Sequence, residues 1–118
     1  MSDEGKLSTT VILATRDGMG TAEADLQYRL AGTYFQLLDE NDLLPGVICF
    51  YADGVKLVCE GSPVLEQLAA LEGKGVRLVI CGTCLNYFEL ADKVQVGVVG
   101  GMTDIIEAQW RAEKVISI

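Results

Sequence analysis

The sequence predicts an α/β protein built on a parallel sheet, and three observations carry this prediction. Short runs of β-branched and apolar residues alternate along the chain with longer segments of helical periodicity, which is the pattern of βαβ units. The chain has 118 residues, a length that suits one domain. Hydrophobic residues make up 50% of it, yet no apolar run approaches the roughly 18–20 residues that cross a bilayer. The apolar excess therefore indicates strands buried on both faces, or a subunit interface.

We expect about five strands, joined by helices that cover both faces of the sheet. The strands are the short apolar runs at 9–15, 47–51, 76–80, 94–99 and 115–118. The helices are the periodic segments from 21 to about 40, from 62 to about 73, from 85 to about 90 and from 102 to about 112. Ser62 as N-cap and Pro63 as first helical residue form a good helix start, whereas 55–59 fits either a strand or a helical turn. This flavodoxin-like or Rossmann-like domain would span 8–118, after a solvated tail at 1–7.

Composition excludes several function classes. The chain has 9 basic and 17 acidic residues, a net charge of −8 and a pI of about 4.3, which argues against nucleic acid or an anionic membrane as partner. It has no histidine, so Ser-His and Cys-His catalytic pairs and histidine metal ligands are excluded. The first six residues carry acidic side chains and no apolar stretch, unlike a signal peptide. We therefore expect a cytoplasmic protein whose thiols are reduced.

The sharpest chemical feature is the motif Cys-Gly-Thr-Cys formed by residues 81–84. It follows the third predicted strand and precedes a predicted helix. Because backbone N–H groups at a helix start stabilise a thiolate, Cys81 is expected to ionise readily and to expose its sulfur. The motif alone leaves four hypotheses open: a dithiol switch, a persulfide-carrying cysteine, a zinc site that would also need Cys49 and Cys59, or two small apolar residues at a strand end.

Spacing excludes several known classes of cysteine enzyme. Thioredoxin-like proteins carry C-x-x-C after their first strand, whereas here it lies in the last third of the chain. A cysteine phosphatase loop needs an arginine six residues after its cysteine, where this chain has Tyr87. Rhodanese-type loops also favour basic residues, and none lies between Arg77 and Lys93. A phosphate or sulfate substrate is therefore not expected.

Three other features are weaker. The turn at 17–20 (Asp-Gly-Met-Gly) is expected to join a strand to a helix, with a role in lining the site as the alternative. Cys49 lies within an apolar strand and is expected to pack in the core. Cys59 is expected to pack as well, and the alternative places it at the same sheet edge as Cys81.

Three stretches resemble the DsrE/DsrF-like superfamily. They are the strand and turn 11–20, the segment 54–62, and the segment 75–88 that contains Cys-Gly-Thr-Cys-Leu-Asn-Tyr-Phe. The similarity covers nearly the whole chain after residue 8. It is greatest to the C-terminal domain of the YedF-like proteins, which are sulfurtransferase-like and associated with selenium metabolism. Those proteins commonly carry an N-terminal TusA-like domain that this sequence lacks, so a separate TusA-like partner is one expectation.

The resemblance implies a DsrE-like fold and cysteine-based handling of sulfur. In the sulfur-relay members, a cysteine at the end of this strand accepts sulfur as a persulfide, and Cys81 occupies that position. Cys84 matches the YedF-like pattern and could discharge the persulfide by forming a disulfide with Cys81. The implied function is a carrier or sulfurtransferase for sulfur or selenium, between donor and acceptor proteins, with no cofactor and no metal. The alternative is a non-catalytic C-x-x-C module that senses redox state or binds a small ligand.

The resemblance and the composition also suggest a pocket and an assembly. Residues expected to line the pocket around the persulfide are Gly18, Met19, Gly20, Gly82 and Thr83. High hydrophobic content in a small chain, together with the habit of DsrE-like proteins, implies a homo-oligomer, a trimer or a hexamer. The residues expected to contribute to its interface are Tyr87, Phe88, Met102 and Trp110.

Overall fold

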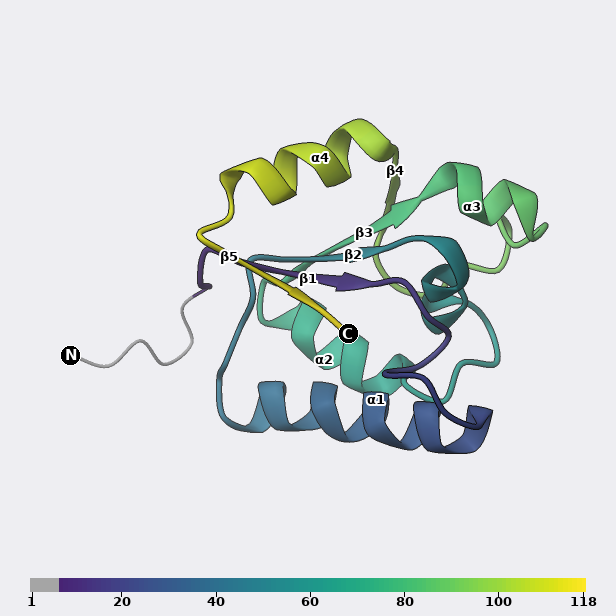
Figure 1. The fold of residues 1–118 in the computed structure, drawn as a ribbon, viewed down its shortest axis with the longest axis horizontal. Helices are drawn as coiled ribbons and strands as arrows, with labels where there is room; N and C mark the ends of the chain where they lie inside the picture. Colours follow the sequence, from purple (N-terminus) through teal and green to yellow (C-terminus); the bar gives the residue numbers. More distant parts are fainter. Residues whose placement is uncertain (1–6) are drawn as a thin grey trace.

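Five strands form one parallel sheet in the computed structural model, which describes residues 7–118 (Figure 1). The strands are β1 (Thr10–Ala14), β2 (Val47–Phe50), β3 (Arg77–Cys81), β4 (Val98–Gly100) and β5 (Lys114–Ser117). Their order across the sheet is β4-β3-β2-β1-β5, and every neighbouring pair is parallel. The predicted α/β fold with a five-stranded parallel sheet is confirmed.

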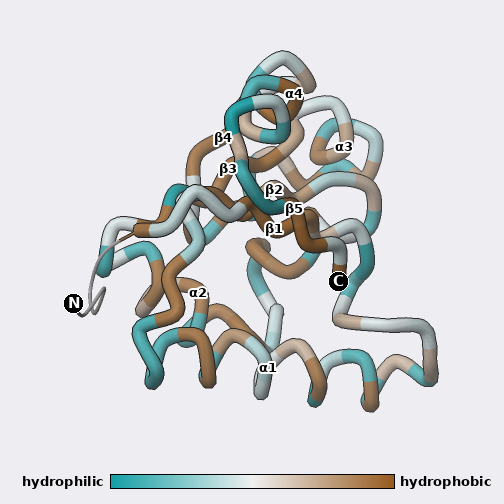
Figure 2. Tube along the Cα trace, turned by 60° about the vertical axis from the view of Figure 1, so that its left-hand side comes forward, coloured by the Kyte–Doolittle hydropathy of each residue, from teal (hydrophilic) through white to brown (hydrophobic). Residues whose placement is uncertain are grey.

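Helices cover both faces of this sheet, also as predicted (Figures 1 and 2). The helical elements are α1 (Ala24–Glu40), a 3₁₀ helix η1 (Ala52–Val58), α2 (Leu65–Gly73), α3 (Gly82–Tyr87) and α4 (Met102–Arg111). Helices α1 and α2 lie on one face, because both crossovers step in the same direction along the sheet. From β4 the chain returns to β5 at the far edge, and this reversal places α4 on the opposite face.

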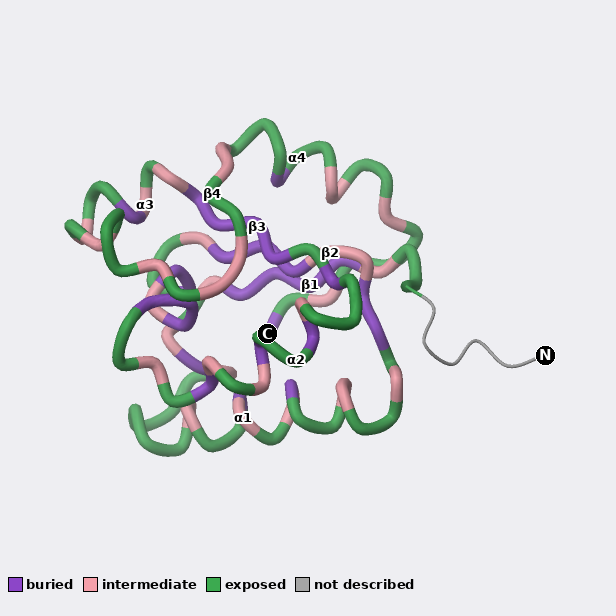
Figure 3. The backbone as a smooth tube through the Cα atoms, turned by 180° about the vertical axis from the view of Figure 1, so that it is seen from behind, coloured by how far each residue is buried: buried purple, intermediate pink, exposed green. Residues whose placement is uncertain are grey.

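The core lies between these layers and is centred on the three inner strands. Figure 3 shows the inner strands as almost continuously buried, whereas α1 exposes its outer side. Strand β3 has four buried residues in succession, which is the pattern of a parallel strand covered on both faces. Phe35 of α1, Leu68 of α2 and Ile105 of α4 close the core from the two sides. No helix among residues 7–118 combines the length and the apolar character that crossing a membrane requires.

Several element boundaries differ from the sequence prediction. Helix α2 begins at Leu65 rather than at Pro63, and the Ser62 hydroxyl accepts the N–H of Val64 at 3.2 Å in the turn before the helix. Helix α3 begins at Gly82 rather than at residue 85, so the C-x-x-C motif enters the helix itself. The undecided run 55–59 belongs to the 3₁₀ helix η1, except for Cys59 at its end.

The fourth strand is shorter than predicted. The predicted run 94–99 is interrupted at Gly97, whose φ of 86° is not that of a strand. A side chain at Gly97 would press against Leu78 and Ile80. The backbone N–H of Gly97 donates a hydrogen bond to the Glu72 carboxylate at 2.9 Å. Only the residues after this glycine join β3.

The tail predicted at 1–7 lies outside the described residues except for Leu7. That residue forms an isolated parallel bridge with Leu44.

The 3₁₀ helix η1 lies directly against the end of β1, and Gly54 makes this contact possible. A Cβ atom at Gly54 would overlap the carbonyl oxygen of Ala14. The same oxygen accepts the N–H of Tyr51 at 3.2 Å. The backbone of η1 is therefore held against β1 with no room for a side chain.

We predict that Gly54→Ala lowers the free energy of unfolding by about 3 kcal/mol, because the new methyl group forces two backbones apart. Urea denaturation followed by circular dichroism measures this change. Gly73→Ala is the matched control, because Gly73 lies at the end of α2 with open space around it. Equal stability of the two variants would contradict the tight contact.

Candidate functional site

The two cysteines of the C-x-x-C motif lie at the carboxyl end of β3. Cys81 is the last residue of the strand and the N-cap of α3, and Cys84 lies in the first turn of that helix. Strand β3 lies between β2 and β4, so β2 separates it from β1 and the turn after β1. The motif therefore occupies the sheet edge where parallel α/β proteins bind their ligands.

Cys84 joins α3 to η1. Its sulfur accepts the backbone N–H of Ala52 at 3.1 Å, and Cys81 lies three residues before it at the start of the same helix. Ala52 has a φ of 51°, a left-handed conformation that is uncommon for a residue with a Cβ atom. Two thiols and one strained backbone amide thus meet at a single point, and strain of this kind often accompanies a functional site.

Burial raises the pKa of the Cys84 thiol above its ordinary value. The hydrogen bond with Cys81 and the negative charge that Cys81 can carry raise the Cys84 pKa further, whereas the Ala52 N–H opposes this shift. Cys84 therefore keeps its proton at neutral pH. Its S–H group can donate that proton in a hydrogen bond to the Cys81 sulfur.

The expectation that Cys81 exposes its sulfur is wrong for this chain. Cys81 is only 2% exposed, and Cys84 is the half-buried member of the pair. The physical reason is the position of Cys81 in the sheet. Strand β4 pairs with it through Gly100, and α3 begins at the next residue.

The other predicted site residues are divided between two places. Gly82 packs beside β4, where a Cβ atom would lie 3.3 Å from the Gly100 oxygen, and Thr83 is exposed on α3. Gly18 and Met19 lie against the start of α1, where the Met19 N–H binds the Gln27 oxygen at 3.0 Å. No hydrogen bond within residues 7–118 connects the 18–20 turn to either cysteine of the motif.

The two remaining cysteines, Cys49 and Cys59, are packed in the core. Cys49 is fully buried in β2, and burial raises its pKa to about 11 despite the opposing charge of Arg77. The Cys59 S–H group donates to the Val55 oxygen at 3.2 Å, and burial raises its pKa as well. Over the described part of the chain, no three Cys, Asp or Glu side chains come together as metal ligands would.

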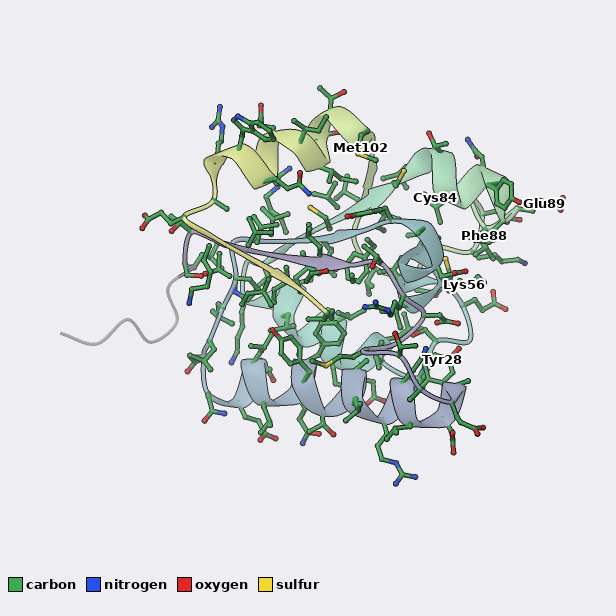
Figure 4. All side chains as sticks on the ribbon, in the orientation of Figure 1. Tyr28, Lys56, Cys84, Phe88, Glu89 and Met102 are labelled. Atoms are coloured by element: carbon green, nitrogen blue, oxygen red, sulfur yellow. The ribbon has the colours of Figure 1, made fainter. Side chains whose placement is uncertain are left out.

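A hollow that the sequence analysis missed lies one turn of α3 beyond Cys84. Its lining residues are Asp17, Tyr28, Lys56, Cys59, Glu60, Gly61, Ser62, Phe88 and Leu90. Phe88 follows Cys84 by one turn of α3, and the Lys56 ammonium lies 4.4 Å from the centre of the Phe88 ring. Figure 4 shows Cys84, Phe88, Lys56 and Tyr28 following one another along the same end of the molecule. The only feature of the sequence that could have indicated this hollow is the four-residue spacing of Cys84 and Phe88, which places both on one side of a helix.

The fold and the thiol pair define a class: a small parallel α/β domain with paired thiols at the carboxyl end of its third strand. The chain belongs to the DsrE/DsrF-like family, whose model matches residues 10–118. This membership connects it with sulfur-relay-related function and confirms the predicted family.

Solved structures share the fold at low identity. The ychN protein of E. coli matches with a TM-score of 0.72 and 20% identity, over 95% of this chain and 100% of that chain. A conserved protein of unknown function from Bacteroides thetaiotaomicron has a TM-score of 0.65 and 20% identity, covering 92% and 93%. A protein of unknown function from Methanobacterium thermoautotrophicum has a TM-score of 0.68 and 18% identity, covering 92% and 97%. None of the curated proteins matches the chain by sequence.

We predict that iodoacetamide labels the C-x-x-C pair at least about tenfold faster than Cys49 in the folded protein at neutral pH, because Cys49 is fully buried with a raised pKa. Tandem mass spectrometry of timed samples measures each site. Cys84→Ser isolates the rate of Cys81, and denatured protein serves as the control in which all thiols react alike. Equal rates at Cys81 and Cys49 in the folded variant would rule out an activated pair.

Proposed function

We propose that this domain carries sulfur as a persulfide on Cys81 and transfers it between the thiols of a donor protein and an acceptor protein. The observation that supports the proposal most directly is the position of Cys81 and Cys84 together at the carboxyl end of β3, where α3 begins. Membership of the DsrE/DsrF-like family supports it independently.

The two thiols have different roles in this proposal. Cys81 is the nucleophile, and Cys84, which keeps its proton, lies three residues further along the chain in α3, where its sulfur accepts the Ala52 N–H. The chain has no histidine, so no imidazole takes a proton from either thiol, as one does in other cysteine enzymes. Burial of Cys81 then protects the reactive sulfur from water and oxidants.

Loading is a thiol exchange in which no net oxidation occurs. The Cys81 thiolate attacks the outer sulfur of a donor persulfide and forms a new S–S bond. The donor's own S–S bond breaks, and its electron pair leaves with the donor thiolate. An acceptor thiolate then attacks the outer sulfur on Cys81 and restores the Cys81 thiolate. The same steps hold with selenium as the outer atom.

Cys84 provides a second exit from the persulfide. After losing its proton to solvent, the Cys84 thiolate attacks the Cys81 sulfur, and the outer sulfur leaves as hydrosulfide with the electron pair. This step oxidises the two thiols to a disulfide and reduces the carried sulfur to sulfide. Cys84 would thus decide how long a persulfide survives.

The spacing of the thiols also favours a second candidate function, a redox-sensing module. Two cysteines three residues apart at the start of one helix can form a disulfide when an oxidant removes two electrons. In that case the pair would respond to oxidants and would not accept sulfur.

We predict that reduced protein incubated with a persulfide donor gains the mass of one sulfur atom, and that Cys81→Ser abolishes the gain. Intact-mass spectrometry measures this. In Cys84→Ser the added sulfur persists at least about tenfold longer, because the thiol that would release sulfide is absent. Cys59→Ser is the matched control and behaves as the unmodified protein.

Two other outcomes would contradict the carrier function. If the protein only loses two hydrogens, the pair is a redox switch. If the sulfur is added to Cys81→Ser as readily as to the unmodified protein, Cys81 is not the carrier.

We also propose that the chain assembles with further copies of itself, as a trimer or a hexamer. Five exposed apolar residues on edge strand β4 and helix α4 form what we call the β4–α4 face: Val98, Val99, Met102, Ile106 and Trp110. Trp110 is 83% exposed, and Met102, Ile106 and Trp110 repeat every four residues along one side of α4. Large apolar surface beside an unpaired strand is typical of a subunit contact.

The other two aromatic residues expected at an interface differ from each other. Tyr87 is 82% exposed at the end of α3 and is free to contact a second copy. Phe88 packs against the core and lies under the Lys56 ammonium, so it does not belong to the β4–α4 face.

We predict that light scattering after size exclusion gives a molar mass of three or six chains at tens of micromolar protein, and that Trp110→Glu reduces it to one chain. The assembly is lost because the substitution would bury a carboxylate at the interface between chains. Leu37→Glu, on the exposed side of α1, is the control and leaves the mass unchanged. A monomer mass for the unmodified protein would end this proposal.

A further inference from the structure

The hollow beside the thiol pair has the size and the polarity of a small-ligand site. Its volume is about 320 Å³, at the lower end of the range for ligand pockets. Phe88 and Leu90 supply an apolar wall. Lys56 supplies a positive charge, and Asp17 and Glu60 supply negative charges. A ligand that matches this lining is small and carries both signs of charge.

The charged groups retain free hydrogen-bonding capacity. The Lys56 ammonium uses one donor on Asp53, at 2.9 Å, and an ammonium has three. Asp17 accepts the Tyr28 hydroxyl at 2.6 Å through one oxygen, and a carboxylate offers several acceptor positions. The Ser62 oxygen accepts the Val64 N–H, which leaves its hydroxyl proton free to donate.

The hollow also lies one turn of α3 from Cys84. Phe88 and Cys84 are one turn apart on α3, which is a rise of about 6 Å along a helix axis. Lys56 and Ala52 belong to η1, which contacts α3 at both levels: Ala52 at Cys84 and Lys56 at Phe88. The contact between η1 and α3 thus joins the hollow to Cys84, and Figure 4 shows Lys56, Phe88 and Cys84 along it.

We propose that this hollow binds a free α-amino acid that carries a thiol, of the cysteine class, as a small acceptor of the carried sulfur. Its ammonium binds Asp17, with Glu60 at the rim, and its carboxylate binds Lys56. Its side chain runs along Phe88 toward Cys84 and Cys81. This inference rests on the proposed persulfide on Cys81.

The transfer step is balanced without any further reactant. The thiol of the bound amino acid loses its proton to solvent, and its thiolate attacks the outer sulfur of the Cys81 persulfide. The bond between Cys81 and that sulfur breaks, and the electron pair returns to the Cys81 thiolate. The product is an amino-acid persulfide, and no net oxidation or reduction takes place.

The binding step is tested with S-methyl-L-cysteine, which keeps both charges but cannot accept sulfur. Titration followed by backbone amide NMR is expected to shift the signals of Lys56, Gly61 and Phe88. The analogues 3-(methylthio)propanoate and 2-(methylthio)ethylamine, which each lack one charge, are expected to bind at least about tenfold more weakly. Lys56→Gln and Asp17→Asn are each expected to weaken S-methyl-L-cysteine by about tenfold as well. Lys114→Gln on edge strand β5 is the control and leaves binding unchanged.

Three outcomes would overturn the proposal: no shifts around the hollow, equal binding of the analogue without an ammonium, or unchanged binding in both charge variants. The transfer step has its own test, in which persulfide-loaded Cys84→Ser protein is discharged at least about tenfold faster by L-cysteine than by 3-mercaptopropanoate. The probe needs no sulfur on Cys81. Binding by Cys81→Ser protein therefore separates a failure of this site from a failure of the persulfide function.

Discussion

The close contact between Gly54 and the end of β1 is the constraint on which the rest of the site depends. Because there is no space for a side chain between these two backbones, η1 has one position relative to the sheet. From that position Ala52 presents its N–H to Cys84, and Lys56 extends over Phe88. Helix α3 is thus held along its length by a neighbour that is itself anchored on β1. The thiols, the strained amide and the hollow share this single support.

Much of the fold could be predicted because its signals are local. Strands such as Val47–Phe50 are short apolar runs that only a doubly covered sheet can bury, and glycine-rich turns mark where they end. Gly97 shows the limit of this approach. The residues around Gly97 have the apolar pattern of a strand. Contacts with Leu78 and with the Glu72 carboxylate, however, hold Gly97 in a conformation that interrupts the predicted strand 94–99. Those contacts depend on where α2 and β3 lie, which periodicity does not reveal.

The site divides in the same way. The position of Cys81 at a strand end follows from its local sequence, but its burial depends on β2 and β4 flanking it, and strand order is a property of the whole sheet. The hollow joins Asp17, Lys56 and Phe88 from three distant segments. No spacing in the sequence connects them. The absence of histidine could be seen in the sequence itself. It leaves the second thiol of the motif, Cys84, as the nearest group in the sequence that can exchange a proton with Cys81.

The shortness of α3 has a consequence for how the buried sulfur is reached. This helix has six residues and ends at Tyr87. Two residues later Glu89, with a φ of 57°, turns the chain back toward the segment that pairs with Glu60. So short a helix can open by local fluctuation while the sheet stays intact, as amide-exchange studies find for weakly supported segments. Access to Cys81 then becomes an equilibrium between closed and open forms of one helical turn. In the proposed carrier function, the opening of α3 would set how readily partners reach a sulfur atom on Cys81, independent of the global stability of the domain.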